Sequence, residues 1–163
     1  MKRKKQTVIF MMLILGFSLF LIHFFDLYLD REQLFYAYER GNLIGRMFRH
    51  YGLNWIWSPV CDLPSVGNGR TYSNDPDKLI AMNIATMKGQ KDAGIASTIK
   101  HFPGTDGKES RDSHFSEATN LSTLEEWKAK QGRVFKALID AGVEAVMTRH
   151  ASFPAVDNRV KNG

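Results

Sequence analysis

The chain has 163 residues, enough for one ordinary domain, and a formal charge of +5 from 22 lysines and arginines against 17 aspartates and glutamates. Charged residues make up 24% of the chain and prolines number only five, which excludes a disordered or low-complexity protein. The single cysteine, Cys61, excludes an intrachain disulfide framework and a zinc site with several cysteines.

The excess of positive charge is confined to the start of the chain. Residues 2–5, KRKK, account for +4 of the net charge of +5, and no acidic residue precedes Asp26. The remainder is nearly neutral and lacks the broad basic surface that contacts phosphate backbones. We therefore expect no nucleic-acid partner.

Residues 7–25, TVIFMMLILGFSLFLIHFF, form an uncharged apolar run. At about 1.5 Å per residue, a helix of this length is close to the ~30 Å hydrocarbon thickness of a bilayer. We predict a single-pass signal anchor at 7–25, with residues 1–6 cytoplasmic and the rest extracytoplasmic under the positive-inside rule. One alternative is a helix buried in the core of a soluble domain. The other is a cleaved secretory signal, whose apolar stretch is normally about 7–15 residues and precedes an A-x-A-like cleavage site.

Three later segments have the features of helices. Apolar residues recur at helical spacing over 31–51. Asp75-Pro76 is typical of an N-cap followed by a first helical residue, and the predicted helix runs to about Lys91. A third helix is expected to begin at Ser122 or Thr123 and to end at Ala141-Gly142.

Three apolar runs, at 54–63, 94–102 and 143–153, predict buried strands. Strands that alternate with helices indicate an α/β protein with a parallel sheet. A complete (β/α)₈ barrel typically needs about 250 residues. We therefore expect residues 31–163 to form a partial (β/α)₈ TIM barrel of about three β/α units, preceded by the transmembrane helix.

Polar residues gather where the predicted strands end, which is the edge at which parallel α/β folds bind ligands. Asp62 and Arg70 follow the first strand, and Lys100-His101 end the second. The candidates in the long loop at 103–120 are Asp106, Arg111, Asp112, Ser113 and His114, and Arg149-His150 close the third strand.

The residue types in these groups suit sugar chemistry. A lysine and a histidine can donate hydrogen bonds to hydroxyls, and Asp112 can orient His114 for proton transfer near neutral pH. Taken singly, each has a structural alternative: Lys100 as an ion-pair partner, His101 as a core histidine and Asp112 as a turn former.

Together these residues resemble the signature of glycoside hydrolase family 3, and most of all its β-N-acetylhexosaminidase branch. The matching strings are Lys100-His101-Phe102-Pro103-Gly104 and Asp112-Ser113-His114. Segments 54–63, 69–73 and 141–155 resemble further motifs of the family in the same order, so that the resemblance covers about residues 31–158.

The resemblance implies a TIM barrel that hydrolyses terminal β-linked N-acetylhexosamine by a retaining mechanism, with no cofactor or metal. His114 is similar in position to the family's general acid/base, and Asp112 to the residue that orients it. The positions similar to sugar-binding residues are Arg70, Lys100, His101 and Asp62.

Two departures concern the loop after the signature. Thr105-Asp106-Gly107 stands where the family often has His-Gly, and 116–119 lacks a common proline. The family's nucleophile is an aspartate of a later strand, so we expect these 163 residues alone to be inactive. The alternatives are a membrane-anchored, non-catalytic module for sugar binding or partner assembly, and a metal-dependent hydrolase that uses His101, His114 and His150.

Overall fold

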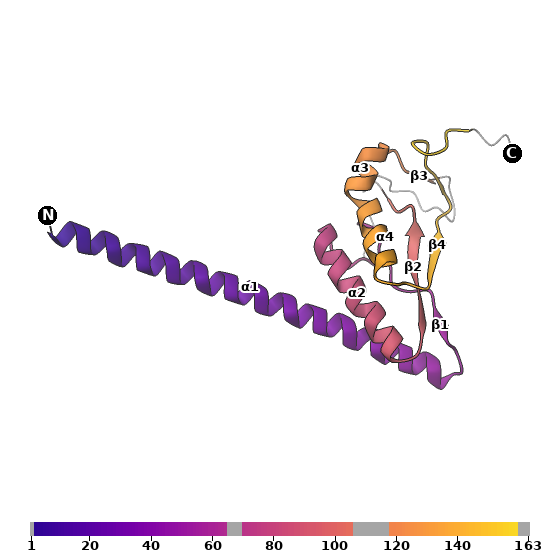
Figure 1. The fold of residues 1–163 in the computed structure, drawn as a ribbon, viewed down its shortest axis with the longest axis horizontal. Helices are drawn as coiled ribbons and strands as arrows, with labels where there is room; N and C mark the ends of the chain where they lie inside the picture. Colours follow the sequence, from indigo (N-terminus) through magenta and orange to yellow (C-terminus); the bar gives the residue numbers. More distant parts are fainter. Residues whose placement is uncertain (1, 65–69, 106–117, 160–163) are drawn as a thin grey trace. The chain divides into compact units, whose positions relative to one another are not determined.

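The computed structural model of the protein describes residues 2–64, 70–105 and 118–159. The chain divides into two compact units, Met1–Phe35 and Tyr36–Gly163, and helix α1 (Lys2–His50) belongs to both. The elements that follow α1 in the second unit are β1 (Trp55–Ile56), α2 (Pro76–Asp92), β2 (Ala96–Phe102), β3 (Ala118–Thr119), α3 (Leu124–Ala129), α4 (Gln131–Asp140), β4 (Ala145–Thr148) and β5 (Ala151–Ser152) (Figure 1).

The predicted membrane anchor requires a correction. Residues 7–25 are helical, but they are one part of α1, which continues through the charged residues Asp26, Asp30 and Arg31. In the part of the chain that the structure describes, no helix is both long enough and apolar enough to cross a bilayer. The transmembrane helix at 7–25 is therefore not supported, and the localisation that rested on it stays a prediction.

The predicted parallel sheet is confirmed. Its strand order is β1-β2-β4, with Trp55 opposite Ala96 and Thr98 opposite Ala145. Helices α2 and α4 contact β2 and one another, and Figure 1 shows them beside the sheet. Because all three strands are parallel, their carboxyl ends lie at one edge, where the polar residues were expected to meet.

The strand expected at 54–63 is regular only over β1. The Asn54 carbonyl accepts from the Ala96 N–H, so the chain advances four residues to Ser58 while β2 advances only two, and the regular register is lost. The segment nevertheless stays beside β2. The Ser58 carbonyl accepts from the Thr98 N–H at 3.0 Å, and the Cys61 N–H donates to the Lys100 carbonyl at 2.9 Å. This irregular pairing brings the residue after Cys61 next to the end of β2.

The helix starts follow the predicted signals. The Asp75 carboxylate accepts from the Asp77 N–H at 2.8 Å, and Pro76 is the first residue of α2. Thr123, the second of the two expected candidates, caps α3 in a reciprocal capping box with Glu126.

The third predicted helix is divided into α3 and α4, and the strand expected at 143–153 into β4 and β5. The backbone leaves the helical region at Lys130 (φ −118°, ψ −93°), and the bend places Gly132 against the Trp127 ring. Beyond β4 the chain changes partner, because β5 pairs with β3 in a second, two-stranded parallel sheet.

A hydrophobic core lies between the sheet and the helices of the second unit. Its buried members come from the segment after β1, from α2, from β2 and from α4: Cys61, Leu79, Met87, Ile99, Val134, Phe135 and Leu138. On the opposite side of the sheet, the Trp55 ring is exposed, and its indole N–H donates to the Thr98 hydroxyl at 2.6 Å.

Within the second unit, the end of α1 packs so closely on α2 that the backbones of the two helices are in contact. A Cβ added at Gly41 would lie 2.3 Å from the Thr86 carbonyl oxygen, and one added at Gly89 would lie 2.1 Å from the Tyr38 carbonyl oxygen. Only hydrogen fits at either position. The phenol of Tyr38 also donates to the Asp92 carboxylate at 2.9 Å, which fixes the two helices in register.

We predict that Gly41→Ala lowers the free energy of unfolding by about 1–3 kcal/mol, because the added methyl group collides with backbone that cannot move aside cheaply. Urea denaturation of the whole chain measures the change. Gly16→Ala is the matched control: Gly16 is also helical, but its Cβ would meet nothing within 4 Å, so stability should stay equal or rise slightly. Equal effects of the two substitutions would contradict the packing argument.

Candidate active site

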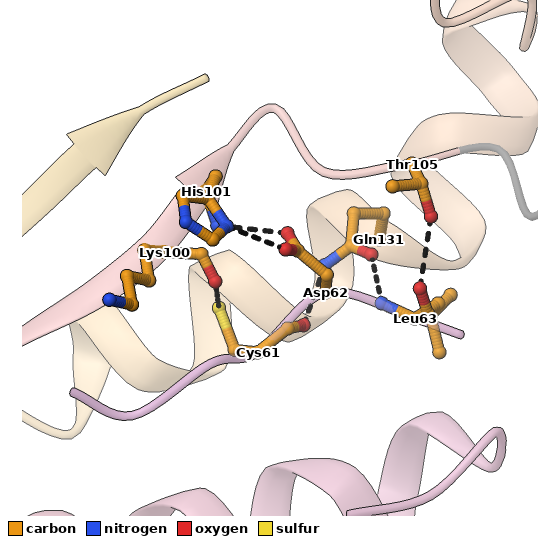
Figure 2. Close-up of polar contacts among 7 residues, drawn as sticks. All are labelled: Cys61, Asp62, Leu63, Lys100, His101, Thr105 and Gln131. Atoms are coloured by element: carbon orange, nitrogen blue, oxygen red, sulfur yellow. Dashed lines mark hydrogen bonds and ion pairs between the residues drawn. The ribbon is translucent and has the colours of Figure 1, made fainter. Parts of the chain in front are cut away.

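The centre of the candidate site is the contact between Asp62, which follows the β1 segment, and His101, which belongs to β2 (Figure 2). Oδ1 of the carboxylate accepts from the His101 backbone N–H at 2.8 Å, and Oδ2 lies 2.8 Å from the ring atom Nδ1. Asp62 is only 1% exposed, whereas the His101 side chain keeps 18% of its surface. Because a carboxylate accepts hydrogen bonds, Nδ1 carries the hydrogen in this pair, and Nε2 takes no part in the contact.

His101 can make this contact because it sits at a β-bulge. Lys100 pairs with Met147 of β4, and the next pair is Phe102 with Thr148, so that His101 is an extra residue in β2. An extra residue of this kind leaves its backbone unpaired and turns its side chain to a new direction. Here Asp62 satisfies the unpaired N–H and receives the redirected ring.

The backbone on both sides of Asp62 is held by side chains (Figure 2). Gln131, the first residue of α4, donates from Nε2 to the Cys61 carbonyl at 2.9 Å and accepts at Oε1 from the Leu63 N–H at 2.7 Å. The Thr105 hydroxyl donates to the Leu63 carbonyl at 2.9 Å. The polar backbone groups of Cys61 and Leu63 are thereby all satisfied, which a buried segment requires.

The residues after His101 in the Lys-His-Phe-Pro-Gly string are mainly structural. The Phe102 ring packs edge-on against Trp127 and Phe135, with centroids 5.8 and 5.2 Å apart. The Pro103 carbonyl accepts from the Trp127 indole N–H at 2.7 Å. These contacts fix the chain immediately beyond His101.

Gly104 ends the string in a conformation that favours glycine. Its φ is +86°, and an added Cβ would lie 2.2 Å from Cγ of Gln131. Both the backbone angle and the packing therefore exclude a side chain at this position.

Lys100 places a cation beside this pair. Partial burial and the positive charge of Arg70 both lower the pKa of Lys100, and the Asp62 carboxylate opposes them in part. Arg70 is therefore near enough to act electrostatically on Lys100. Three predicted sugar-binding residues, Asp62, Lys100 and His101, thus come from two segments that meet at the carboxyl ends of the strands, and the fourth, Arg70, acts electrostatically on Lys100.

The other predicted residues are five in the loop after Thr105 and the pair Arg149-His150 that follows β4. Asp112 and His114, with Asp106, Arg111 and Ser113, lie outside the described residues. Arg149 follows β4, and its backbone N–H donates to the Phe102 carbonyl at 2.7 Å.

Within the described ranges, no group of three or more histidine, cysteine or acidic side chains could hold a metal ion. Burial raises the pKa of the Cys61 thiol, which therefore stays protonated and lacks the thiolate that binds metals. The histidine set of the metal-dependent alternative includes His114, which falls outside the described ranges.

Sequence reasoning missed Gln131 and Thr105. Thr105 was noted only as a departure from the family's His-Gly. Gln131 carried no signal, because a glutamine early in a helix is most often solvated. Gln131 acquires its role where α4 meets the segment after β1, and Thr105 acquires its role where the segment after β2 meets Leu63.

These features define an α/β protein with polar side chains gathered at the carboxyl ends of parallel strands. The Glycosyl hydrolase family 3 N terminal domain matches residues 26–162, and the chain therefore belongs to glycosyl hydrolase family 3. The resemblance read from the signature strings is confirmed.

Characterised relatives share this stretch of sequence. A beta-N-acetylglucosaminidase/beta-glucosidase of Cellulomonas fimi is 36% identical over 128 residues, covering 76% of this chain and 22% of its own length. A beta-hexosaminidase of Stenotrophomonas maltophilia is 35% identical over 130 residues, covering 77% of this chain and 38% of its own. The chain thus spans between about a fifth and two fifths of the length of these relatives.

Solved structures confirm the fold. A family 3 beta-N-acetylglucosaminidase from Paenibacillus sp. has a TM-score of 0.69 at 35% identity, covering 76% of this chain and 24% of that one. NagZ from Neisseria gonorrhoeae, in complex with N-trifluoroacetyl-D-glucosamine, has a TM-score of 0.69 at 29% identity and covers 76% and 37%. A beta-glucoside phosphorylase, BglX, bound to 2FGlc, has a TM-score of 0.70 at 33% identity and covers 77% and 24%.

The electrostatic coupling of Lys100 to Arg70 gives a prediction. Arg70→Gln should raise the pKa of Lys100 toward its ordinary value, because it removes a neighbouring positive charge that disfavours the protonated amine. Titration of the Lys100 side chain by NMR measures the shift. Arg133→Gln, which removes an exposed partner of Asp77, is the control and should leave Lys100 unchanged. An unaltered Lys100 titration in Arg70→Gln would show that burial alone lowers its pKa.

Proposed function

We propose that this chain supplies the sugar-binding and proton-transfer groups of a glycosidase that acts on terminal β-linked N-acetylhexosamine. The observation that carries the proposal is the buried Asp62–His101 pair beside Lys100, at the carboxyl ends of parallel strands. Relatives named beta-hexosaminidase and beta-N-acetylglucosaminidase support the choice of sugar.

The proposed sugar contacts follow from the donor and acceptor groups present. With Nδ1 engaged by Asp62, the His101 ring offers Nε2 to one sugar hydroxyl in a fixed direction. The Lys100 ammonium offers three donors, and the Arg70 guanidinium offers a planar set. Hydroxyl groups both donate and accept, so that this mixture can satisfy several of them at once.

The proposed proton transfers rest on the family resemblance. His114, oriented by Asp112, would give its proton to the glycosidic oxygen as the bond from that oxygen to the anomeric carbon breaks. It would later take a proton from the incoming water. A retaining mechanism also needs a carboxylate that bonds to the anomeric carbon, and the resemblance assigns it to a strand later than those found in these 163 residues.

A second candidate is a non-catalytic sugar-binding module. It is favoured by one observation: the Asp62–His101 pair and the residues that hold it are complete within the described part of this chain. Such a module would use the same contacts without breaking a bond, so binding and turnover must be measured separately.

For binding, we expect the whole chain to bind N-acetylglucosamine in a saturable manner, as followed by NMR or calorimetry. Lys100→Met keeps the aliphatic stem and removes the charged donor, so affinity should fall about tenfold. Lys91→Met, an exposed lysine at the end of α2, is the matched control and should have no effect. Absence of binding at millimolar sugar would refute the proposed contacts.

For turnover, the whole chain is incubated with aryl β-N-acetylglucosaminide and aryl β-glucoside. We expect no release of the aryl group, because the nucleophile is assigned to another strand. Release that His114→Ala abolishes and His50→Ala leaves intact would overturn this expectation while supporting the acid/base assignment.

Each assay is run with and without inorganic phosphate, since a structural neighbour is a phosphorylase. A rate that depends on phosphate would identify phosphate, in place of water, as the acceptor.

A further inference from the structure

Gln131 occupies an unusual position for a residue at the start of a helix. Its side chain is 1% exposed, and both ends of its amide are bonded to backbone groups that flank Asp62. The orientation of the amide is determined by these partners. The Cys61 carbonyl can only accept, so it faces Nε2, and the Leu63 N–H can only donate, so it faces Oε1.

We propose that Gln131 is a positioning residue for the sugar site, and that it acts by fixing the direction of the Asp62 carboxylate and thereby the ring of His101. This inference rests on the proposed function, because it assigns His101 to sugar binding. Two hydrogen bonds, one on each side of Asp62, restrict rotation of the two peptide units that carry this residue. The carboxylate can then present Oδ1 to the His101 N–H and Oδ2 to Nδ1 at the same time.

The same side chain also touches the segment that carries His101. Gly104, three residues beyond His101, packs against Cγ and Cδ of Gln131 so closely that no side chain fits between them. Thr105 adds a hydrogen bond to the Leu63 carbonyl from this same segment. Gln131 therefore lies against both segments that supply the pair, and it is bonded to the backbone on each side of Asp62.

A second buried glutamine offers a matched comparison. Gln90, in α2, is 0% exposed and accepts from the Ser97 hydroxyl at 2.6 Å. Ser97 lies near the start of β2, whereas His101 lies near its end. The two glutamines therefore have the same chemistry and burial, but only Gln131 contacts the backbone that carries the site.

The test compares Gln131→Met with Gln90→Met in the whole chain. Methionine keeps the length of glutamine and removes its hydrogen bonds, so we expect both variants to be less stable. The first readout is the nitrogen NMR spectrum of the His101 ring, which reports which ring nitrogen carries the hydrogen. We expect the Nδ1–H form to persist in wild type and Gln90→Met, and to be replaced by a mixture of tautomers in Gln131→Met.

The second readout is affinity for N-acetylglucosamine, which we expect to fall about five- to tenfold in Gln131→Met and to stay unchanged in Gln90→Met. An unchanged His101 spectrum in folded Gln131→Met, or an equal change in Gln90→Met, would overturn the inference. If Gln131→Met does not fold, the inference is tested with the second variant Thr105→Val. It removes only the bond to Leu63 and should shift the His101 spectrum in the same direction, and no shift would refute the inference.

The two readouts separate this inference from the proposed function. A wild-type chain that binds no sugar would refute the proposed function alone, because the His101 spectrum is recorded without sugar.

Discussion

The arrangement of this protein's site depends on one buried carboxylate. Asp62 is almost fully enclosed, and a buried carboxylate is tolerated only where hydrogen bonds replace the lost water. His101 supplies both of the hydrogen bonds that the structure assigns to it, one from the backbone and one from the ring. The bulge in β2 serves the same contact, since it releases the N–H that Asp62 accepts.

The surroundings of this pair show how a glycosidase signature combines structure with chemistry. Phe102, Pro103 and Gly104 follow Lys100 and His101 directly, yet each is explained by its contact with Trp127, Phe135 or Gln131. The string is therefore short but constrained at every position. Substitutions at these three residues should therefore disturb the Asp62–His101 pair through the direction of the chain.

The parallel sheet supplies the common edge, and the helices hold it in place. α4 contributes Gln131 at its first residue, and α2 packs on the end of α1 through glycines that allow backbone contact. Such close packing leaves little freedom for the strands to shift relative to one another. A site assembled from two separate strand ends benefits from this rigidity, because small displacements weaken directional hydrogen bonds.

Much of the fold was readable from local sequence. Strand–helix alternation predicted the parallel α/β sheet, Asp75-Pro76 and Thr123 marked true helix starts, and the Lys-His-Phe-Pro-Gly string identified the family. Element lengths were less predictable. The strand expected at 54–63 loses its regular pairing after Ile56, and the backbone bends at Lys130 inside an apparently single helix. The apolar run at 7–25 predicted a membrane span, but the helix around it extends far beyond the run.

The sequence by itself determined the fold class, the family and the residues that stand at the strand ends, because these depend on periodicity and on short adjacent motifs. Only the tertiary structure decided how Asp62 and His101 meet. It also decided that Gln131 and Thr105 hold the backbone on either side of Asp62. These contacts join residues about 40 to 70 positions apart. No local pattern records such a contact, since it exists only once the strands and α4 have packed against one another.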